Sequence, residues 1–501
     1  MADNQNKYIT QTELNEAKFV SYASAQTLTN EEKQTVLTNI GMADENLYVT
    51  LTCPVSQDII GAIVSVTVNG NTESKEWNGT TLLFIVPMFE QYTVSFSTVG
   101  GYYTPDTVSY ISKRNSTRRL TVSYDSAPYT DLSLLDITGG TVSLRETANC
   151  YVISQGGYYE LPLVYGCAIM NGETNVSAYT QATGTHTSPF YNYLNEQIKS
   201  PFIEEDTGID AVSGQSVLID TSDFIIDGIY LTNRKLCKYL RFHVSSIPSL
   251  GGNATIAIKD GNGQIMWSWH IWAYPPGLSI FSHTNTNGHT YNFFNVNLGW
   301  VKDFADSKKG TSPYYQWGRK DPMLRGSASA AVGSFNITSA ASSLAATIQN
   351  PNVFNTCKGA HYNWWQNGDT PVDFYNYWDA SQISTGNSDK NIVKTVYDPC
   401  PVGFNVPCGN AFLGFSKSNG GTWDNGWTWD GNFFQAAGHR HREGIGIHGV
   451  GSSGSYWLAS SYSQDNAYNL HFESKDVNPQ FNYSYSRANG FSVRPVARPQ
   501  T

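Results

Sequence analysis

Short runs of alternating apolar and polar residues, separated by turn-forming residues, constrain the fold of this chain more than any other feature. Valine alternates with serine and threonine over residues 64–68, and Asn69-Gly70-Asn71 then turns the chain. Residues 92–96 and 120–124 repeat the alternation. Successive side chains of a strand point to opposite faces of a sheet, so this period of two predicts strands. Strands of this length between Gly, Asn and Pro turns predict an immunoglobulin-like β-sandwich over residues 46–126.

The sequence pattern of residues 127–278 predicts a second β-sandwich module. Near its end, two alternating runs flank Asp260-Gly261-Asn262-Gly263, which is a strong hairpin signal. In the second run Trp267 and Trp269 fall on one face, and such an aromatic row is more typical of a sheet core than of a binding platform. Pro275-Pro276 then breaks the sheet and marks the boundary of the module.

Tryptophan is concentrated in the last part of the chain, residues 279–501. Nine of the thirteen tryptophans lie at or beyond Trp300, while only 14% of all residues are charged. Low charge with abundant Trp, Tyr, Asn and Gly is typical of a surface that stacks on sugars and hydrogen-bonds their hydroxyl groups. Each tryptophan taken alone is nevertheless more often a core residue. The candidate glycan-binding residues are Trp364, Trp365, Trp423, Asp424, Asn425, Trp427 and Trp429.

Residues 1–45 carry the clearest helical signals. Thr29 at the N-cap and Glu32 three residues later form a capping box, and Gly41 is placed to end the helix. A helix of about three turns is too short to be stable alone, so it must pack on a partner.

This segment also carries a resemblance. Ala25-Gln26-Thr27-Leu28-Thr29, Glu31-Glu32-Lys33 and Asn39-Ile40-Gly41 resemble, in order and spacing, a short segment of fibre and tail-associated proteins of tailed bacteriophages. The resemblance implies a virion-attachment or trimer-registering element, and the alternative is a generic capped helix of a folded domain. The residues that would make the attachment are Leu28, Val36, Leu37 and Ile40.

A second resemblance covers residues 145–498. Asn297-Leu298-Gly299 and several later segments resemble the C-terminal module of fimbrial-tip-like and paralogous surface proteins of gut anaerobes; these segments are 314–322, 397–407, 436–440, Tyr456-Trp457 and 490–496. That module is related to the C-type-lectin-like and formylglycine-generating-enzyme folds. The resemblance implies a mixed α/β domain with a small twisted sheet and long loops, used for adhesion. The chain departs from the family at Asn295-Val296, where a charged Asp-Arg pair is usual.

Several classes of function are disfavoured. The net charge of −10 and the lack of any basic run longer than two residues argue against a nucleic-acid partner. Nothing reaches the roughly 20 consecutive apolar residues of a transmembrane helix. No catalytic motif is found, so neither an enzyme nor a cofactor is expected. The seven scattered cysteines predict buried thiols, although Cys400 and Cys408 are near enough in sequence to form a disulfide.

Metal binding has weak support. His439, His441 and His448 could supply nitrogen ligands, but no Cys or carboxylate partner has a zinc-site spacing, so a solvated or partner-contacting loop is preferred. Such a cluster could respond to pH near 6. Calcium is left open for the oxygen-rich turns 423–426 and 430–432, and no metal site is assigned.

Together these observations predict a multidomain, mainly β chain: short N-terminal helices, two immunoglobulin-like sandwiches and a C-terminal mixed α/β C-type-lectin-like domain. We expect a structural virion protein, a bacteriophage head or tail fibre made in the host cytoplasm, which binds capsid or tail proteins and a host cell-surface glycan or protein. Fibres commonly trimerise, so a homotrimer is favoured. The N-terminus lacks a secretory signal, which favours this expectation; the alternative is a secreted bacterial adhesin or pilus-tip subunit whose signal has been removed.

Overall fold

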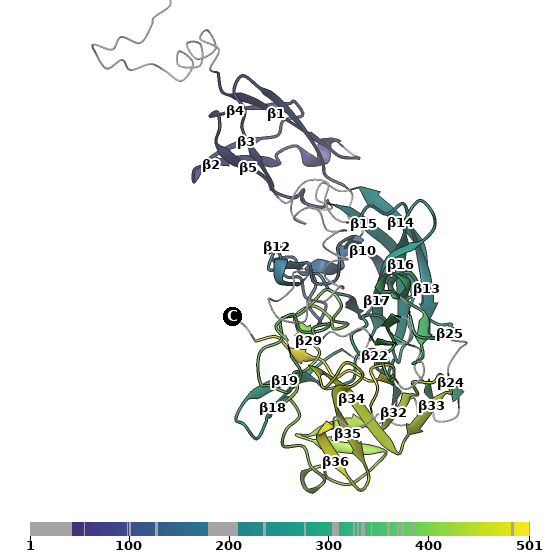
Figure 1. Ribbon diagram of the computed structural model, residues 1–501. Coiled ribbons are helices and arrows are strands. Elements are labelled where there is room, and N and C mark those ends of the chain that lie inside the picture. The colour runs from purple at the N-terminus through teal and green to yellow at the C-terminus, as the bar shows by residue number, and fades with distance from the viewer. Residues whose placement is uncertain are drawn as a thin grey trace, which may run out of the picture. The chain divides into compact units, whose positions relative to one another are not determined.

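A computed structural model describes residues 43–178 and 209–499 (Figure 1), apart from 55, 98, 100–101, 126–128, 234–236, 275–276, 303–309, 324–325, 328–329, 332–335, 342, 358–360, 368–369, 372–374, 383 and 482–484. The predicted N-terminal helices, with Leu28, Val36, Leu37 and Ile40, lie outside these residues. The chain forms two compact units, residues 1–128 and 129–501. It is mainly β, with one α-helix, α4 (Leu344–Gln349), among the described residues, so the multidomain, mainly β class is confirmed.

The first unit contains two sheets that share one core. Their strand orders are β4-β1-β7 and β3-β2-β5-β6. Buried side chains alternate with more exposed ones along each core strand, and Leu47, Phe84 and Val94 are fully buried. The period of two seen in the sequence therefore produces one core face for each sheet. The strands are β1 (Glu45–Thr52), β2 (Ile63–Val68), β3 (Asn71–Glu76), β4 (Leu82–Val86), β5 (Gln91–Phe96), β6 (Val108–Ile111) and β7 (Thr117–Ser123).

The second unit begins with two four-stranded sheets. Their strand orders are β14-β15-β10-β8 and β13-β16-β17-β9. The predicted hairpin at Asp260 is confirmed, because β16 and β17 pair in antiparallel register on either side of it. The strands are β8 (Tyr129–Asp131), β9 (Cys150–Ile153), β10 (Gly157–Pro162), β13 (Ser213–Ile219), β14 (Ile225–Asn233), β15 (Lys238–Ser246), β16 (Gly252–Lys259) and β17 (Ile265–Ala273).

The rest of this unit consists of short strands and long connections. A four-stranded sheet has the order β18-β19-β38-β29, and a seven-stranded sheet has the order β22-β37-β32-β34-β35-β36 with β33 paired to β32. The strands of these sheets are β18 (Ile280–Thr284), β19 (Thr290–Phe294), β22 (Tyr315–Gln316), β29 (Phe404–Asn405), β32 (Ala437–Arg440), β33 (Ile447–Val450), β34 (Ser453–Ser461), β35 (Ala467–Glu473), β36 (Val477–Phe481), β37 (Gly490–Phe491) and β38 (Val496–Ala497).

Five further strand pairs are short. Four of them are antiparallel, and β25–β26 is parallel. They are formed by β11 (Ile169–Met170), β12 (Glu173–Thr174), β20 (Val301–Lys302), β21 (Gly310–Thr311), β23 (Gly326–Ser327), β24 (Ala330–Ala331), β25 (Asn336–Thr338), β26 (Val353–Asn355), β27 (Gln366–Asn367) and β28 (Thr370–Pro371).

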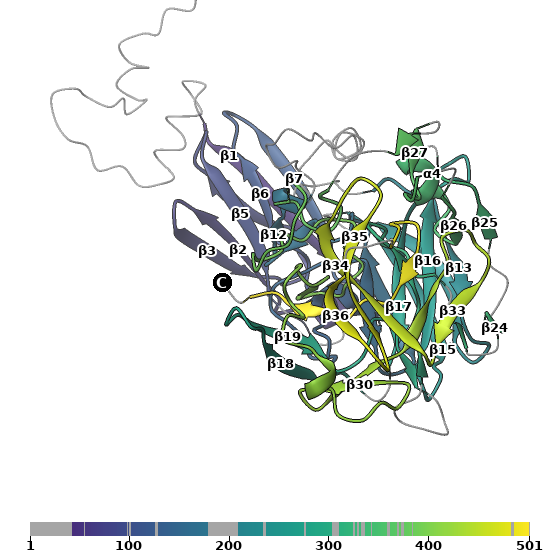
Figure 2. The same ribbon diagram turned by 60° about the horizontal axis from the view of Figure 1, so that its bottom comes forward.

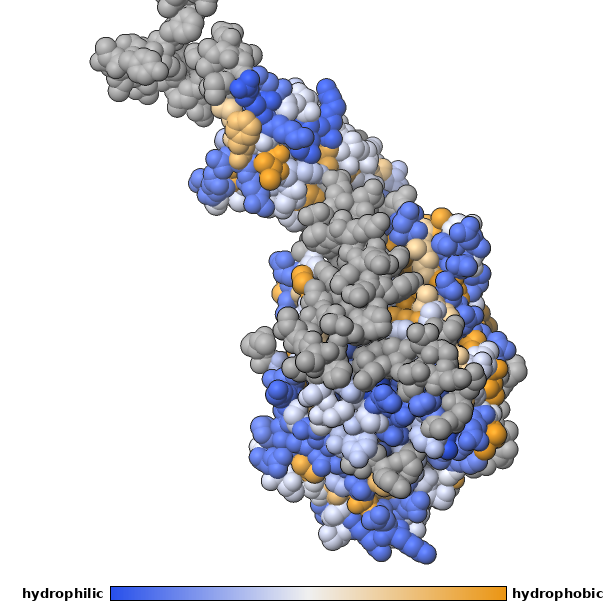
Figure 3. Space-filling view, in the orientation of Figure 1, coloured by the Kyte–Doolittle hydropathy of each residue, from blue (hydrophilic) through white to orange (hydrophobic). Residues whose placement is uncertain are grey.

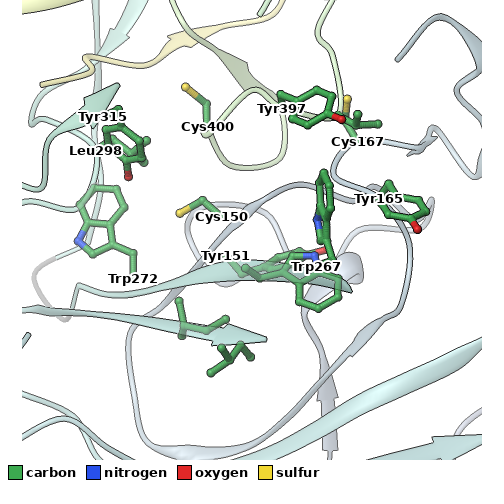
Figure 4. Close-up of a cluster of buried hydrophobic side chains, with 14 of the residues drawn as sticks. Cys150, Tyr151, Tyr165, Cys167, Trp267, Trp272, Leu298, Tyr315, Tyr397 and Cys400 are labelled. Atoms are coloured by element: carbon green, nitrogen blue, oxygen red, sulfur yellow. The ribbon is translucent and has the colours of Figure 1, made fainter. Parts of the chain in front are cut away.

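One large core cluster joins the early and late parts of the second unit. It contains side chains from Leu132 to Val493, so the predicted boundary between residues 127–278 and 279–501 falls inside one compact unit. Figure 4 shows Trp267 of β17 among aromatic side chains from both parts of the sequence. Its ring meets the ring of Tyr165 at a centroid distance of 4.9 Å and that of Tyr397 at 5.7 Å. The early sheets and the late loops therefore stabilise each other.

Candidate recognition site

The seven candidate glycan-binding residues fall into two separate groups. Trp364 and Trp365 belong to the large core, whereas the remaining five lie in and just before the hairpin of β30 (Gly426–Trp429) and β31 (Asn432–Gln435), which packs on another hydrophobic cluster. Trp364 is fully buried, and its indole N–H donates to the Trp317 carbonyl at 2.7 Å. Trp365 is 7% exposed. The two rings of this pair are therefore surrounded by protein.

Trp427 and Trp429 form the inner face of the β30 hairpin. They are only 3% and 1% exposed, and their indole N–H groups donate to the carbonyls of Glu473 and Ser416. The ring of Trp429 stacks on that of Phe415 at a centroid distance of 4.7 Å. Alternation along β30 places both rings against the core, where they anchor the hairpin.

Trp423 differs from the other four candidate tryptophans because it is only half-buried. Its ring makes edge-to-face contacts with two core rings. The centroid distances are 5.3 Å to Trp427 and 6.3 Å to Phe472. Asp424 and Asn425 follow it and are exposed. The arrangement presents part of an indole ring beside a carboxylate and an amide, which are groups that can bind a polar ligand with an apolar face.

Backbone contacts hold this turn in place. Asn425 has a φ of 56°, a left-handed conformation that Asn tolerates better than most residues. Its carbonyl accepts the Ala436 N–H at 2.7 Å, and the Asp424 N–H donates to the Gly426 carbonyl at 3.1 Å. At the other end of β30, the Asp430 carboxylate lies 2.7 Å from Nδ1 of His283 in β18. Figure 2 shows β30 at the periphery of the unit, near β18 and β19.

The surface around this end of the unit is mostly polar. On the face seen in Figure 3, the described residues at the lower end are mainly hydrophilic, with scattered apolar residues between them. Such a surface suits a hydroxylated ligand better than a large apolar one. No helix among the described residues is long and apolar enough to cross a membrane.

Buried charges fix other loops of the second unit. Lys320 forms an ion pair with Asp321 at 2.6 Å, and Lys394 lies 3.5 Å from Asp398. All four of these side chains are almost fully buried. Lys394 also donates to the carbonyls of Cys400, Pro401 and Phe404. Cys400 and Cys408 do not form the disulfide that their spacing allowed, and burial raises the pKa of the Cys400 thiol well above the ordinary value. These groups belong to the scaffold.

Two buried arginines, Arg319 and Arg494, donate to carbonyl and amide oxygens. Arg494 donates to the side-chain oxygen of Asn297 and to the carbonyls of Phe294 and Phe433. Arg319 donates to the Val353 carbonyl and to the side chains of Gln316 and Asn355. Burial lowers the pKa of each guanidinium to about 10. Their role is therefore to tie distant loops together.

The histidines that were considered as metal ligands do lie together. The centroid of His439 is 6.2 Å from that of His441 and 5.9 Å from that of His448, and the last two rings stack at 5.2 Å. His471 of β35 lies close to them, which the sequence did not indicate because it is 23 residues beyond His448. In the part of the chain that the structure describes, no group of three or more His, Cys, Asp or Glu side chains is arranged to hold a metal ion.

Comparison with protein-family models and with curated proteins finds no match for this chain. Function must therefore be argued from the residues and their arrangement.

Proposed function

We propose that this chain is a structural virion protein, a bacteriophage head or tail fibre. Its N-terminal residues 1–45 attach it to capsid or tail proteins, and its C-terminal part binds a glycan or protein on the host cell surface. The N-terminal resemblance to phage fibre segments supports the attachment, and the resemblance of residues 145–498 to surface adhesins supports the binding. The single structural observation that supports recognition is the half-buried Trp423, held at the surface beside the exposed Asp424 and Asn425.

The finer fold assignment belongs to this proposal. We interpret residues 46–126 and 127–278 as immunoglobulin-like spacer modules and residues 279–501 as a C-type-lectin-like domain. Two sheets around one core support the first interpretation. Short strands joined by long, internally packed loops support the last one, because loops on a rigid scaffold commonly carry recognition.

A glycan fits the chemistry of the turn at Trp423. The exposed part of the indole ring would stack on the apolar face of a sugar, while the Asp424 carboxylate and the Asn425 amide would bind hydroxyl groups. Hydrogen bonds to a charged acceptor contribute about 1.5–3 kcal/mol each, more than neutral ones. Trp427 would take no direct part, since its ring supports Trp423 from below.

Replacing Trp423 tests this site. We expect Trp423→Ala to weaken binding of the purified chain to host cells or host polysaccharide about tenfold or more, because aromatic anchors of this kind often contribute about 2 kcal/mol. Asn425→Gly keeps the left-handed backbone accessible and removes only the amide, so a smaller loss is expected. The matched control is Tyr462→Ala, which removes a ring that is 41% exposed elsewhere in the unit. Equal binding by the Trp423 variant and the control would exclude this turn as the site.

The location of the protein tests the assignment as a fibre. Antibody raised against residues 300–501 should label phage particles in electron micrographs, at the capsid for a head fibre or at the tail for a tail fibre. Label on the surface or the pili of phage-free bacteria would instead support the secreted adhesin or pilus-tip subunit. Sedimentation analysis of the purified chain would show whether it is the homotrimer that we propose.

A further inference from the structure

Four of the ten histidines of the chain gather on one face of the seven-stranded sheet. His439 and His441 lie in or directly after β32, His448 lies on β33, and His471 lies on β35. The ring of Tyr485 joins the groups, with centroid distances of 6.1 Å to His439 and 5.2 Å to His471. Neither the proposed attachment nor the proposed binding uses this cluster.

The cluster spans the pairing of an edge strand. β33 pairs with β32, and His439 lies directly opposite His448 in that register. No residue of β33 is fully buried, and its apolar contact with a core cluster comes from the half-buried Ile447. Like charges directly opposite each other in a strand pair are destabilising. Protonation of both histidines would therefore act against the pairing of β33.

Partial burial and the neighbouring histidines disfavour protonation of the His439 imidazole. Burial and then the three facing histidines lower the pKa of His439 to about 4. Burial also lowers the pKa values of His441 and His471. The carboxylate of Glu443 favours protonation of His441, and those of Glu473 and Asp476 favour protonation of His471. Arg442 opposes protonation of His441. The other titratable or charged groups that face the cluster are therefore Arg442, Glu443, Glu473, Asp476 and Tyr485.

Two backbone hydrogen bonds join this hairpin to the turn at Trp423. The Gly451 N–H, just beyond β33, donates to the Ala436 carbonyl at 2.7 Å. The Ala436 N–H in turn donates to the Asn425 carbonyl at 2.7 Å. Displacement of β33 would remove the first of these bonds, which holds Ala436, and Ala436 in turn supports the turn.

We propose that the β32–β33 hairpin is an acid-operated latch, in which protonation of the histidine cluster releases β33 from β32 and loosens the turn that carries Trp423. The release follows from the cluster and its strand pairing alone. Its consequence for ligand binding rests on the proposed function of Trp423.

The expected size of the effect follows from proton linkage. In the closed hairpin the pKa of His439 is about 4, and opening returns it toward the ordinary value of 6.5. Protons therefore bind the open form more tightly, so opening becomes more favourable as the pH falls below 6.5 and stops changing below about 4. At pH 5 this one group would raise the ratio of open to closed hairpin about 30-fold.

Hydrogen–deuterium exchange of the full chain at pH 7.5 and pH 5 tests the latch, after correction for the intrinsic pH dependence of exchange. We expect protection of residues 437–450 to fall about 30-fold at pH 5 and to recover at pH 7.5, while β34 in the same sheet stays protected. His439→Gln should remove most of this response, and His289→Asn, at an exposed histidine of the same unit, should leave it unchanged. His448→Gln changes the exposed histidine that lies opposite His439. It should also reduce the response, and it can replace the His439 variant in this test if that variant does not fold.

The outcomes separate the latch from its alternatives. Unchanged protection at pH 5, or the full loss in both histidine variants, would overturn the proposal. So would a response that disappears with a chelator, because the trigger would then be a metal ion. Trp423→Ala should keep the acid response, since the latch does not need the ligand. Opening of the hairpin with no change in cell binding by the unmodified chain would contradict only its coupling to Trp423.

Discussion

Asp389 shows how a single residue fixes the geometry of a loop in this chain. Its carboxylate accepts hydrogen bonds from the side chains of Asn285, Tyr291, Asn287 and Asn410, at 2.6 to 2.9 Å. Burial alone would raise the pKa of Asp389, but these four donors outweigh it and lower the pKa to about 2. A carboxylate with a lowered pKa in the folded state stabilises the fold above its unfolded pKa, and the contribution is lost as the pH falls through the folded value.

Asp389→Asn is therefore expected to destabilise the chain at pH 7 by about 1–3 kcal/mol, because an amide cannot accept from all four donors. Thermal unfolding monitored by circular dichroism would show a lower Tm for the variant. The difference from the unmodified chain should narrow as the pH falls from the ordinary pKa of 3.8 toward 2, where the native carboxylate also becomes protonated. Asp223→Asn, at an exposed carboxylate, is the control. An equal Tm for the two variants would contradict the role of Asp389.

The partners of the buried cations could not be predicted from the sequence. Arg494 stands between Val493 and Pro495, and the structure buries it. Its acceptors at Asn297 and Phe294 lie about 200 positions earlier in the chain, and no local pattern connects such distant positions. The same holds for Trp427 and Trp429. Their alternate spacing allowed either a core face or a binding face, and only the packing of Phe415 and Phe434 distinguishes the two.

At the scale of elements, the sequence correctly predicted the features that depend on neighbouring residues alone. The Asp260 turn formed as predicted, with its carboxylate accepting the N–H groups of Asn262 and Gln264. Alternation correctly predicted that Trp267 and Trp269 of β17 face a core. It did not predict that the opposite face of β17 is buried as well. His270 on that face lies 3.2 Å from the Tyr315 hydroxyl, a contact that depends on the packing of a later segment.

The two glycines of the Asp260 turn give a matched pair of variants. Gly263 has a φ of 79°, whereas Gly261 does not lie in the left-handed region, and no atom would contact a Cβ at either position. Gly263→Ala should therefore destabilise the chain by about 1 kcal/mol through backbone strain alone. Gly261→Ala should be neutral or slightly stabilising, because it restricts the unfolded chain. Chemical denaturation of both variants would measure the difference, and equal stabilities would show that the turn does not hold Gly263 in this conformation.

At the scale of the whole molecule, the two units have separate cores. The core of the first unit contains only side chains from Leu47 to Tyr124, and the clusters of the second unit begin at Leu132. A unit with its own hydrophobic core can fold alone. Within the second unit, by contrast, the shared core means that residues 279–501 need the sheets that precede them.

This difference predicts how the chain can be divided. A fragment of residues 129–501 should fold cooperatively and bind host cells as strongly as the full chain, because it keeps the turn at Trp423 and every cluster that supports it. The same fragment should not cosediment with phage particles that lack the protein, since the proposed attachment segment is missing, whereas residues 1–128 should cosediment without binding cells. A fragment of residues 279–501 should be unfolded, because it lacks Trp267 and the rest of β17, and circular dichroism would show this. A folded 279–501 fragment would contradict the dependence on the shared core. Cosedimentation of residues 129–501 with the particles would place the attachment site outside the N-terminal segment.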